Sequence, residues 1–176
     1  MPNEMINVPQ GEFKVASGEG KILTTILGSC VATCLWDPIN RVGGMNHILL
    51  PAGSTKNSPM AMSDGVNLME LLVNTMLRSG ARKDNIRAKV FGGASMFDRA
   101  GGVGEQNQSF ALWFLENENV PILKQSIGGN RGRKVRFSPS DGSAQMKFLE
   151  DTWKENSVRR PSVVNVPAVQ NEITLF

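Results

Sequence analysis

Two side chains in this sequence could together perform nucleophilic and acid–base chemistry near neutral pH. His47 is the only histidine of the chain, and Cys30 precedes it by seventeen residues. Histidine is the side chain whose ordinary pKa lies in that range, whereas a thiol with a pKa of about 8.5 needs a base to become a reactive thiolate. A cysteine hydrolase with Cys30 as nucleophile and His47 as base is therefore the first function to test.

The residues around Cys30 add two further elements of such a site. Cys30 ends a Leu27-Gly28-Ser29-Cys30 turn, and a turn of this kind aligns backbone N–H groups, so Gly28 and Ser29 are predicted to help hold an oxyanion. The imidazole also needs an orienting partner, and the neighbouring predicted strands offer no acidic residue. Thr24 and Thr25 are the alternatives, by hydroxyl or carbonyl oxygen.

Non-catalytic interpretations of the same residues have to be weighed. Cysteine is among the most buried residue types, and a lone histidine in an apolar strand is often a hydrogen-bonded core residue. Cys34 would share one strand face with Cys30, but two thiols and one histidine are too few ligands for a structural zinc site. We expect Cys34 to be a core residue, with a redox pair as the alternative, and we expect no metal.

Length, charge and cysteine usage restrict the class of protein. The chain has 176 residues, enough for one domain with a real core, and a formal net charge of +3 from 19 basic and 16 acidic residues. This small excess does not favour nucleic-acid binding. Two cysteines, no secretory-type N-terminus and no apolar stretch of about 18 residues indicate the cytoplasm.

The pattern of apolar residues predicts more strands than helices. Strands are expected at 13–16, 21–27, 31–36 and 43–50, after a polar segment at 1–12. The sequence Asp37-Pro38-Ile39-Asn40 predicts a turn that joins the last two strands into a hairpin. Pairing about the centre of that turn would put Cys30 opposite positions 47 to 48.

The second half of the chain alternates between the two kinds of element. A helix is expected from Ser63 or Asp64 to Gly80 and another over 107–118, with strands at 86–91 and 120–127 and a hairpin formed by 135–137 and 145–149. We expect one domain over 1–150. The tail, 151–176, has no clear period and could be a docking peptide, a packed strand or mobile chain.

Four separated blocks, in one order, resemble the CheD family of chemoreceptor glutamine deamidases. They are LGSCVA at 27–32, GGMNHILLP at 43–51, GGASMF at 92–97 and GGNRGRKV at 128–135. The resemblance implies that Cys30 is the nucleophile, His47 the base and Thr24 the third member of a triad. Matching site residues carry more weight here than likeness of fold alone.

The resemblance also implies a substrate and an architecture. The expected reaction is hydrolysis of selected glutamine side-chain amides to glutamates on the cytoplasmic helices of methyl-accepting chemotaxis receptors, without a metal or organic cofactor. The expected fold is α+β, with layered mixed β-sheets packed against helices, similar to deamidating bacterial toxins. The protein would be cytoplasmic and recruited to membrane-bound receptor arrays, without inserting into the membrane.

Substrate contacts and partners are open to alternatives. Gly93 and Ser95 could let a receptor helix approach the backbone, and Arg131 and Arg133 could form a basic rim for glutamate-rich helices. Loop glycines more often serve only backbone conformation, and basic clusters are usually solvated faces. An adaptor that binds a CheC-type phosphatase and receptors is the alternative function, and nucleic acid is not an expected partner.

Overall fold

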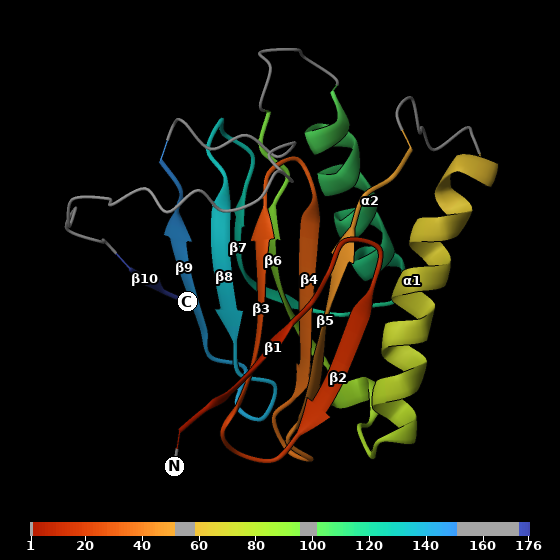
Figure 1. Cartoon of the computed structure of the whole chain (residues 1–176). Coiled ribbons are helices and arrows are strands. Elements are labelled where there is room, and N and C mark those ends of the chain that lie inside the picture. The colour runs from red at the N-terminus through yellow and green to blue at the C-terminus, as the bar shows by residue number, and fades with distance from the viewer. Residues whose placement is uncertain (1, 52–58, 96–101, 151–172) are drawn as a thin grey trace.

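Two β-sheets and two helices make up the described part of the chain, which covers residues 2–51, 59–95, 102–150 and 173–176 in this computed structural model (Figure 1). Sheet A has the strand order β1-β3-β8-β9-β10, and sheet B has the order β2-β5-β4-β6-β7. Each sheet contains one parallel pair, β1 with β3 and β6 with β7, among antiparallel pairs. The expected α+β fold with layered mixed sheets is confirmed.

The elements follow one another in this order along the chain. The strands are β1 Glu4–Asn7, β2 Phe13–Ser17, β3 Lys21–Leu27, β4 Val31–Asp37, β5 Val42–Ile48, β6 Arg87–Gly92, β7 Ile122–Ile127, β8 Arg133–Phe137, β9 Ala144–Phe148 and β10 Thr174–Leu175. The α-helices are α1 Pro59–Arg78 and α2 Val103–Asn117, and Lys83–Asn85 forms a short 3₁₀ helix.

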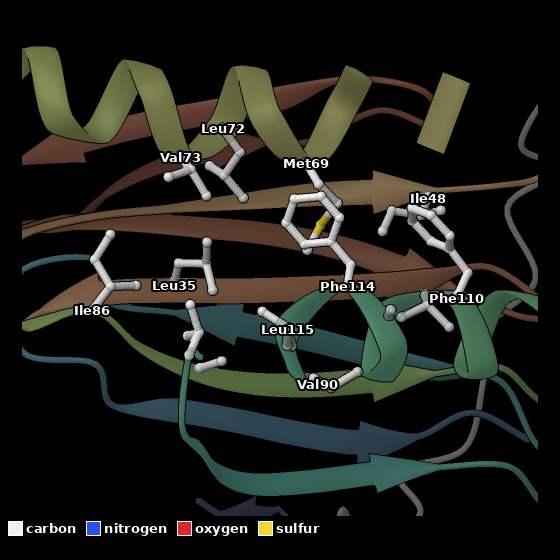
Figure 2. Packing of buried hydrophobic residues seen from close by; sticks show 14 of the residues in the cluster. Leu35, Ile48, Met69, Leu72, Val73, Ile86, Val90, Phe110, Phe114 and Leu115 are labelled. Carbon is white, nitrogen blue, oxygen red and sulfur yellow. The ribbon is translucent and has the colours of Figure 1, made fainter. Parts of the chain in front are cut away.

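Three layers result because sheet B is buried on both of its faces. Alternate residues of β4 face opposite ways, so that Val31 and Leu35 pack with the helices, while Ala32 and Trp36 pack toward sheet A. Figure 2 shows the helix side of this arrangement, where Leu72 of α1 and Phe114 of α2 lie over Leu35 and its neighbours. The second apolar cluster lies between the two sheets.

The predicted hairpin between β4 and β5 is present, but its register differs from the expectation. Val31 pairs with Ile48 and Ala32 with His47, and continuing that register by one residue puts Cys30 opposite Leu49 rather than opposite 47 to 48. The reason is the turn, in which four residues separate the last pair and Arg41 adopts a left-handed conformation with φ of 56°.

Several element boundaries also differ from the prediction. Helix α1 begins at Pro59, before the expected cap, and ends near Gly80, which has the left-handed φ of 106° that a helix terminator favours. Helix α2 begins at Val103, four residues early. Residues 4–7 form a strand that the polar composition of 1–12 did not suggest, and Thr174–Leu175 form a two-residue exposed strand that pairs with β9, whereas 151–172 lie outside the described residues.

Asp37 organises the connection between β4, its turn and the start of the 3₁₀ helix. One carboxylate oxygen accepts the backbone N–H groups of Ile39 and Asn40 at 2.8 and 2.9 Å, and the other accepts the N–H of Arg82 at 2.8 Å. Burial alone would raise the pKa of this carboxyl, but hydrogen bonds from the Asn40 side chain and these backbone groups hold the pKa well below its ordinary value.

We expect Asp37→Asn to lower the free energy of unfolding by about 2 kcal/mol at pH 7, because the amide loses charge-assisted hydrogen bonds. The pKa of Asp37 is lower in the folded than in the unfolded protein. Its contribution is therefore complete above about pH 4 and is lost as the pH falls further. Urea unfolding at several pH values should show the two proteins converging toward acid pH, and a constant difference would contradict the role given to the charge.

Candidate functional site

His47 lies between the two sheets, near the end of β5. It pairs with Ala32 of β4, and both residues face sheet A, where the next layer is β3. The Nδ1 atom of His47 lies 2.9 Å from the hydroxyl oxygen of Thr25 on β3 and 3.2 Å from the carbonyl oxygen of Val8. His47 is only 6% exposed, and its imidazole joins both sheets and the segment that follows β1.

These contacts determine which imidazole nitrogen carries the proton. The carbonyl oxygen of Val8 can only accept, and it receives the Thr25 hydroxyl at 2.8 Å. The Thr25 oxygen can then accept a hydrogen bond from Nδ1–H of His47, and Nδ1–H also points toward the same carbonyl. The neutral ring is therefore the Nδ1–H tautomer, and Nε2 carries the lone pair that a general base requires.

Thr24, the residue expected to complete the triad, does not contact the imidazole in the structure. Its hydroxyl donates to the carbonyl oxygen of Val135 at 2.9 Å, within sheet A. Successive side chains of a strand point to opposite faces, and on β3 the inward positions are Leu23, Thr25 and Leu27. The structure therefore corrects the expectation and gives Thr25 the place beside His47.

Cys30 lies on the same face of sheet B as His47. It immediately precedes β4, is fully buried, and belongs to the cluster between the sheets together with Ala32, which pairs with His47. Residues at i and j−2 across an antiparallel pair are diagonal neighbours on one face. Cys30 and His47 are therefore diagonal neighbours on this face, at the open end of the β4–β5 hairpin.

Asn107 of α2 holds the turn that carries Cys30. Its side-chain amide donates to the carbonyl oxygen of Ser29 at 2.9 Å, and its carbonyl oxygen accepts the N–H of Leu50 at 2.9 Å. One fully buried side chain thus links the nucleophile turn to the end of β5. Because a peptide group is planar and trans, fixing the Ser29 carbonyl toward α2 turns the N–H of Cys30 the opposite way.

Backbone hydrogen bonds join this turn to the first glycine-rich segment. The N–H of Gly93 donates to the carbonyl oxygen of Cys30 at 2.8 Å, and the N–H of Ala94 donates to that of Gly28 at 3.0 Å. Gly92 has a φ of 108°, and a Cβ atom there would overlap the Cys30 carbonyl. The glycine therefore permits the close approach that fixes Cys30.

The two predicted substrate contacts in this segment have different surroundings. Gly93 is buried, and a Cβ atom on it would meet the side chain of Gln108 in α2, so it supports the turn and does not face a ligand. Ser95 is exposed, and its N–H donates to the carbonyl oxygen of Gly129 at 2.7 Å. Ser95 alone of the pair stays available as a surface contact.

The predicted basic rim is divided between the interior and the surface. Arg133 is only 3% exposed, and its guanidinium donates to the carbonyl oxygen of Gly128 at 2.9 Å and to the hydroxyl of Ser126. Burial lowers its pKa. Arg133 is thus a structural residue and not part of a rim, whereas Arg131 is exposed, with its guanidinium 5.0 Å from the ring of Phe148.

Cys34 has the environment expected of a core residue. It is fully buried on the inward face of β4, and burial raises the pKa of its thiol well above the ordinary value, against the opposing effect of Lys89. A thiol with this pKa does not form a thiolate near neutral pH. The chain therefore contains one candidate nucleophilic cysteine, Cys30.

Three contributors to the site were not predicted from the sequence: Asn107, the carbonyl oxygen of Val8, and Gln10, whose Oε1 atom accepts a hydrogen bond from the Cys30 thiol. Asn107 falls on the same helical face as Phe110, Ala111 and Phe114, so an amide in an apolar stripe was a usable signal. No local pattern predicts the place of Gln10 in the site, because that place depends on the hydrogen bonds between residues 8–12 and His47 of β5.

A thiol and an imidazole whose tautomer is set by a hydroxyl form an arrangement typical of cysteine hydrolases. The sequence profile described as CheD chemotactic sensory transduction matches residues 49–148. Relatives from Agrobacterium fabrum, Sinorhizobium medicae and Caulobacter vibrioides, each named probable chemoreceptor glutamine deamidase CheD, are 44%, 51% and 40% identical over 97% of this chain and 96%, 95% and 92% of their own lengths. The chain belongs to the CheD family.

Two other findings complete the comparison. The solved structure of the hypothetical protein YfiH from Bacillus licheniformis aligns with 71% of this chain and 60% of its own at a TM-score of 0.42 and 12% identity, which is too distant to support an inference about function. Within the described residues, neither helix is long and apolar enough to cross a membrane.

The support that Gly92 gives to Cys30 can be tested with a matched pair of variants. Gly92 and Gly129 both have positive φ, but a Cβ atom on Gly129 would meet nothing within 4 Å. We expect Gly129→Ala to cost about 1 kcal/mol of backbone strain, and Gly92→Ala to cost more and to displace Cys30. Urea unfolding and the rate of Cys30 alkylation measure the two effects, and equal alkylation rates in both variants would contradict this role.

Proposed function

We propose that this chain hydrolyses glutamine side-chain amides of chemoreceptors to glutamates, with Cys30 as nucleophile, His47 as general base and acid, and Thr25 as the residue that orients His47. The observation that carries the proposal is the contact of Nδ1 of His47 with Thr25 and Val8. This contact leaves Nε2 as the basic nitrogen, and His47 and Cys30 lie on the same face of sheet B. Membership of the CheD family and the names of its relatives support the substrate class.

The first half of the reaction forms a thioester. Nε2 of His47 takes the thiol proton, and the Cys30 sulfur attacks the carboxamide carbon of the substrate glutamine. Backbone N–H groups of the turn at Gly28 and Ser29 hold the developing oxyanion, and donors of this kind are worth roughly 3 to 4 kcal/mol each. The carbon–nitrogen bond then breaks, and the imidazolium returns its proton to the leaving ammonia.

The second half releases glutamate. His47, neutral again, takes a proton from water, and the resulting hydroxide attacks the thioester carbon. The carbon–sulfur bond breaks, the thiol recovers its proton, and the substrate side chain leaves as a carboxylate. One water is consumed and one ammonia is produced for each glutamine, so no redox partner takes part in the reaction.

Recognition of the receptor is proposed at the surface next to these residues. A groove between the start of β2, the end of β5 and helix α1 has Lys14 and Asp64 among its polar residues and Leu49 among its apolar ones, and it includes Gly11, whose N–H donates to the carbonyl oxygen of His47. Arg131 and Ser95 are exposed candidates for contact with an acidic receptor helix. Recruitment to receptor arrays and binding of a CheC-type phosphatase also stay predictions. No residue of this chain is assigned to the binding of that phosphatase.

Cys30→Ala should reduce ammonia release from a purified receptor fragment to the uncatalysed level, because no other thiol of the site can replace the nucleophile. Mass spectrometry of the fragment would check this, since each deamidation adds about one mass unit when an amide becomes an acid. Cys34→Ala is the matched control, and it should lower stability through lost packing while deamidation continues. Activity of Cys30→Ala equal to wild type would exclude the mechanism.

A second pair of variants separates the two threonines. Thr25→Val should lower kcat at least about tenfold, because the hydroxyl that orients His47 is lost although the Val8 carbonyl still favours the Nδ1–H tautomer. Thr25→Ser should restore most of kcat. Thr24→Val should cost about 1 kcal/mol of stability through one lost hydrogen bond and leave kcat nearly unchanged. The opposite ranking of the two valine variants would return the orienting role to Thr24.

A further inference from the structure

Residues 8–12 form a turn that is fixed to the backbone of the candidate base. The N–H of Gly11 donates to the carbonyl oxygen of His47 at 2.9 Å, and the N–H of His47 donates to that of Glu12 at 3.0 Å. Before the turn, the N–H of Val8 donates to the carbonyl oxygen of Thr24 at 2.9 Å. Gln10 therefore lies in a segment whose two ends are both bonded to strands of the site.

The side chain of Gln10 contacts the candidate nucleophile. The thiol of Cys30 donates to its Oε1 atom, with 3.8 Å between sulfur and oxygen. Gln10 is exposed, whereas Cys30 has an exposed fraction of 0%. An exposed side chain in contact with an enclosed sulfur lies on the solvent side of that sulfur, so Gln10 covers a solvent-facing side of the thiol.

The group that covers the thiol is the same group that the proposed reaction consumes. The side chain of Gln10 ends in a primary carboxamide, and so does a receptor glutamine. We propose that the Gln10 carboxamide occupies the subsite of the substrate carboxamide, and that a substrate glutamine must displace it before the reaction begins. The identity of the displacing group rests on the proposed function, whereas the covering of Cys30 rests only on the contacts above.

The geometry explains how Gln10 can occupy this place without being hydrolysed. A hydrogen bond to an amide oxygen favours the plane of the amide, whereas a nucleophile attacks the carbon from above that plane at about 3 to 3.5 Å. The sulfur of Cys30 instead lies on the oxygen side of the group, at hydrogen-bond distance. The bonded turn restrains the Gln10 main chain, so the side chain acts as a cover and not as a substrate.

A cover of this kind acts on apparent affinity. If the thiol is accessible in only a fraction of molecules, the apparent dissociation constant of a ligand is raised by the inverse of that fraction. Removing the carboxamide should therefore lower KM for a receptor fragment while kcat changes little. If Gln10 instead held the oxyanion, removing its carboxamide would reduce kcat by about 10²-fold or more.

The test is the rate of Cys30 alkylation by iodoacetamide in the full chain, located by peptide mapping. Gln10→Ala should raise the rate at least about tenfold if the covered state dominates. Gln10→Glu keeps the cover and puts a carboxylate beside the thiolate, and should slow alkylation below wild type. Gln125→Ala, which removes an exposed glutamine from edge strand β7, is the matched control and should leave the rate unchanged.

Three results would overturn the proposal. One is an alkylation rate in Gln10→Ala no higher than in wild type, another is a large fall in kcat without a change in KM, and the third is conversion of Gln10 to glutamate in wild type but not in Cys30→Ala. Failure of the proposed function would look different. In that case no variant would deamidate a receptor, while Gln10→Ala would still be alkylated faster than wild type.

Discussion

The site depends on one hydrogen-bonded contact between the two sheets, the one that joins Nδ1 of His47 on sheet B to the hydroxyl of Thr25 on sheet A. This bond forms only if the sheets pack with the inward face of β3 over the inward face of β5. The apolar neighbours of Thr25 on β3, Leu23 and Leu27, are fully buried and fix that packing. The interlayer core therefore sets the tautomer of the imidazole, and a shift of one residue in β3 would turn Thr25 outward.

The nucleophile is positioned by a different set of constraints, which come mostly from the backbone. The carbonyl oxygens of Gly28, Ser29 and Cys30 each accept a hydrogen bond, from Ala94, Asn107 and Gly93 respectively. Arg133 extends this support, because its guanidinium holds the loop at Gly128, whose N–H donates to the carbonyl oxygen of Gly92. The basic and glycine-rich segments thus contribute rigidity to the turn of Cys30.

The sequence alone predicts the chemistry of the site better than its geometry. The Asp37 turn and the apolar runs beside it are enough to predict the β4–β5 hairpin, but the turn that contains the left-handed Arg41 puts Cys30 opposite Leu49 and not opposite 47 to 48. The choice between Thr24 and Thr25 depends on β3 and β4 joining different sheets, although they are consecutive in sequence. Local patterns do not encode that separation, because it follows from long-range packing.

Other differences had usable signals in the sequence. Residues 134–137 alternate basic and apolar side chains, and the period of two places Arg133 on the face of Val135 and Phe137, which is the buried face. The short strand β1 had no such signal, because its residues are mostly exposed and it lies at the edge of sheet A, paired in parallel with β3. Its importance is indirect, since it leads to the carbonyl of Val8 and to the turn of Gln10.

The orienting partners of His47 are a hydroxyl and a carbonyl, both neutral. They set the tautomer as a carboxylate would, but they stabilise the imidazolium less, because a carboxylate would also attract the positive charge of the ring. A base held in this way favours moderate rates. The proposed cover over the Cys30 thiol also lowers the rate, because a substrate must first displace Gln10 from the carboxamide subsite. Hydrolysis of an amide to a carboxylate and ammonium in water is not reversed by the same site, so a protein that performs it on other proteins gains more from selectivity than from speed.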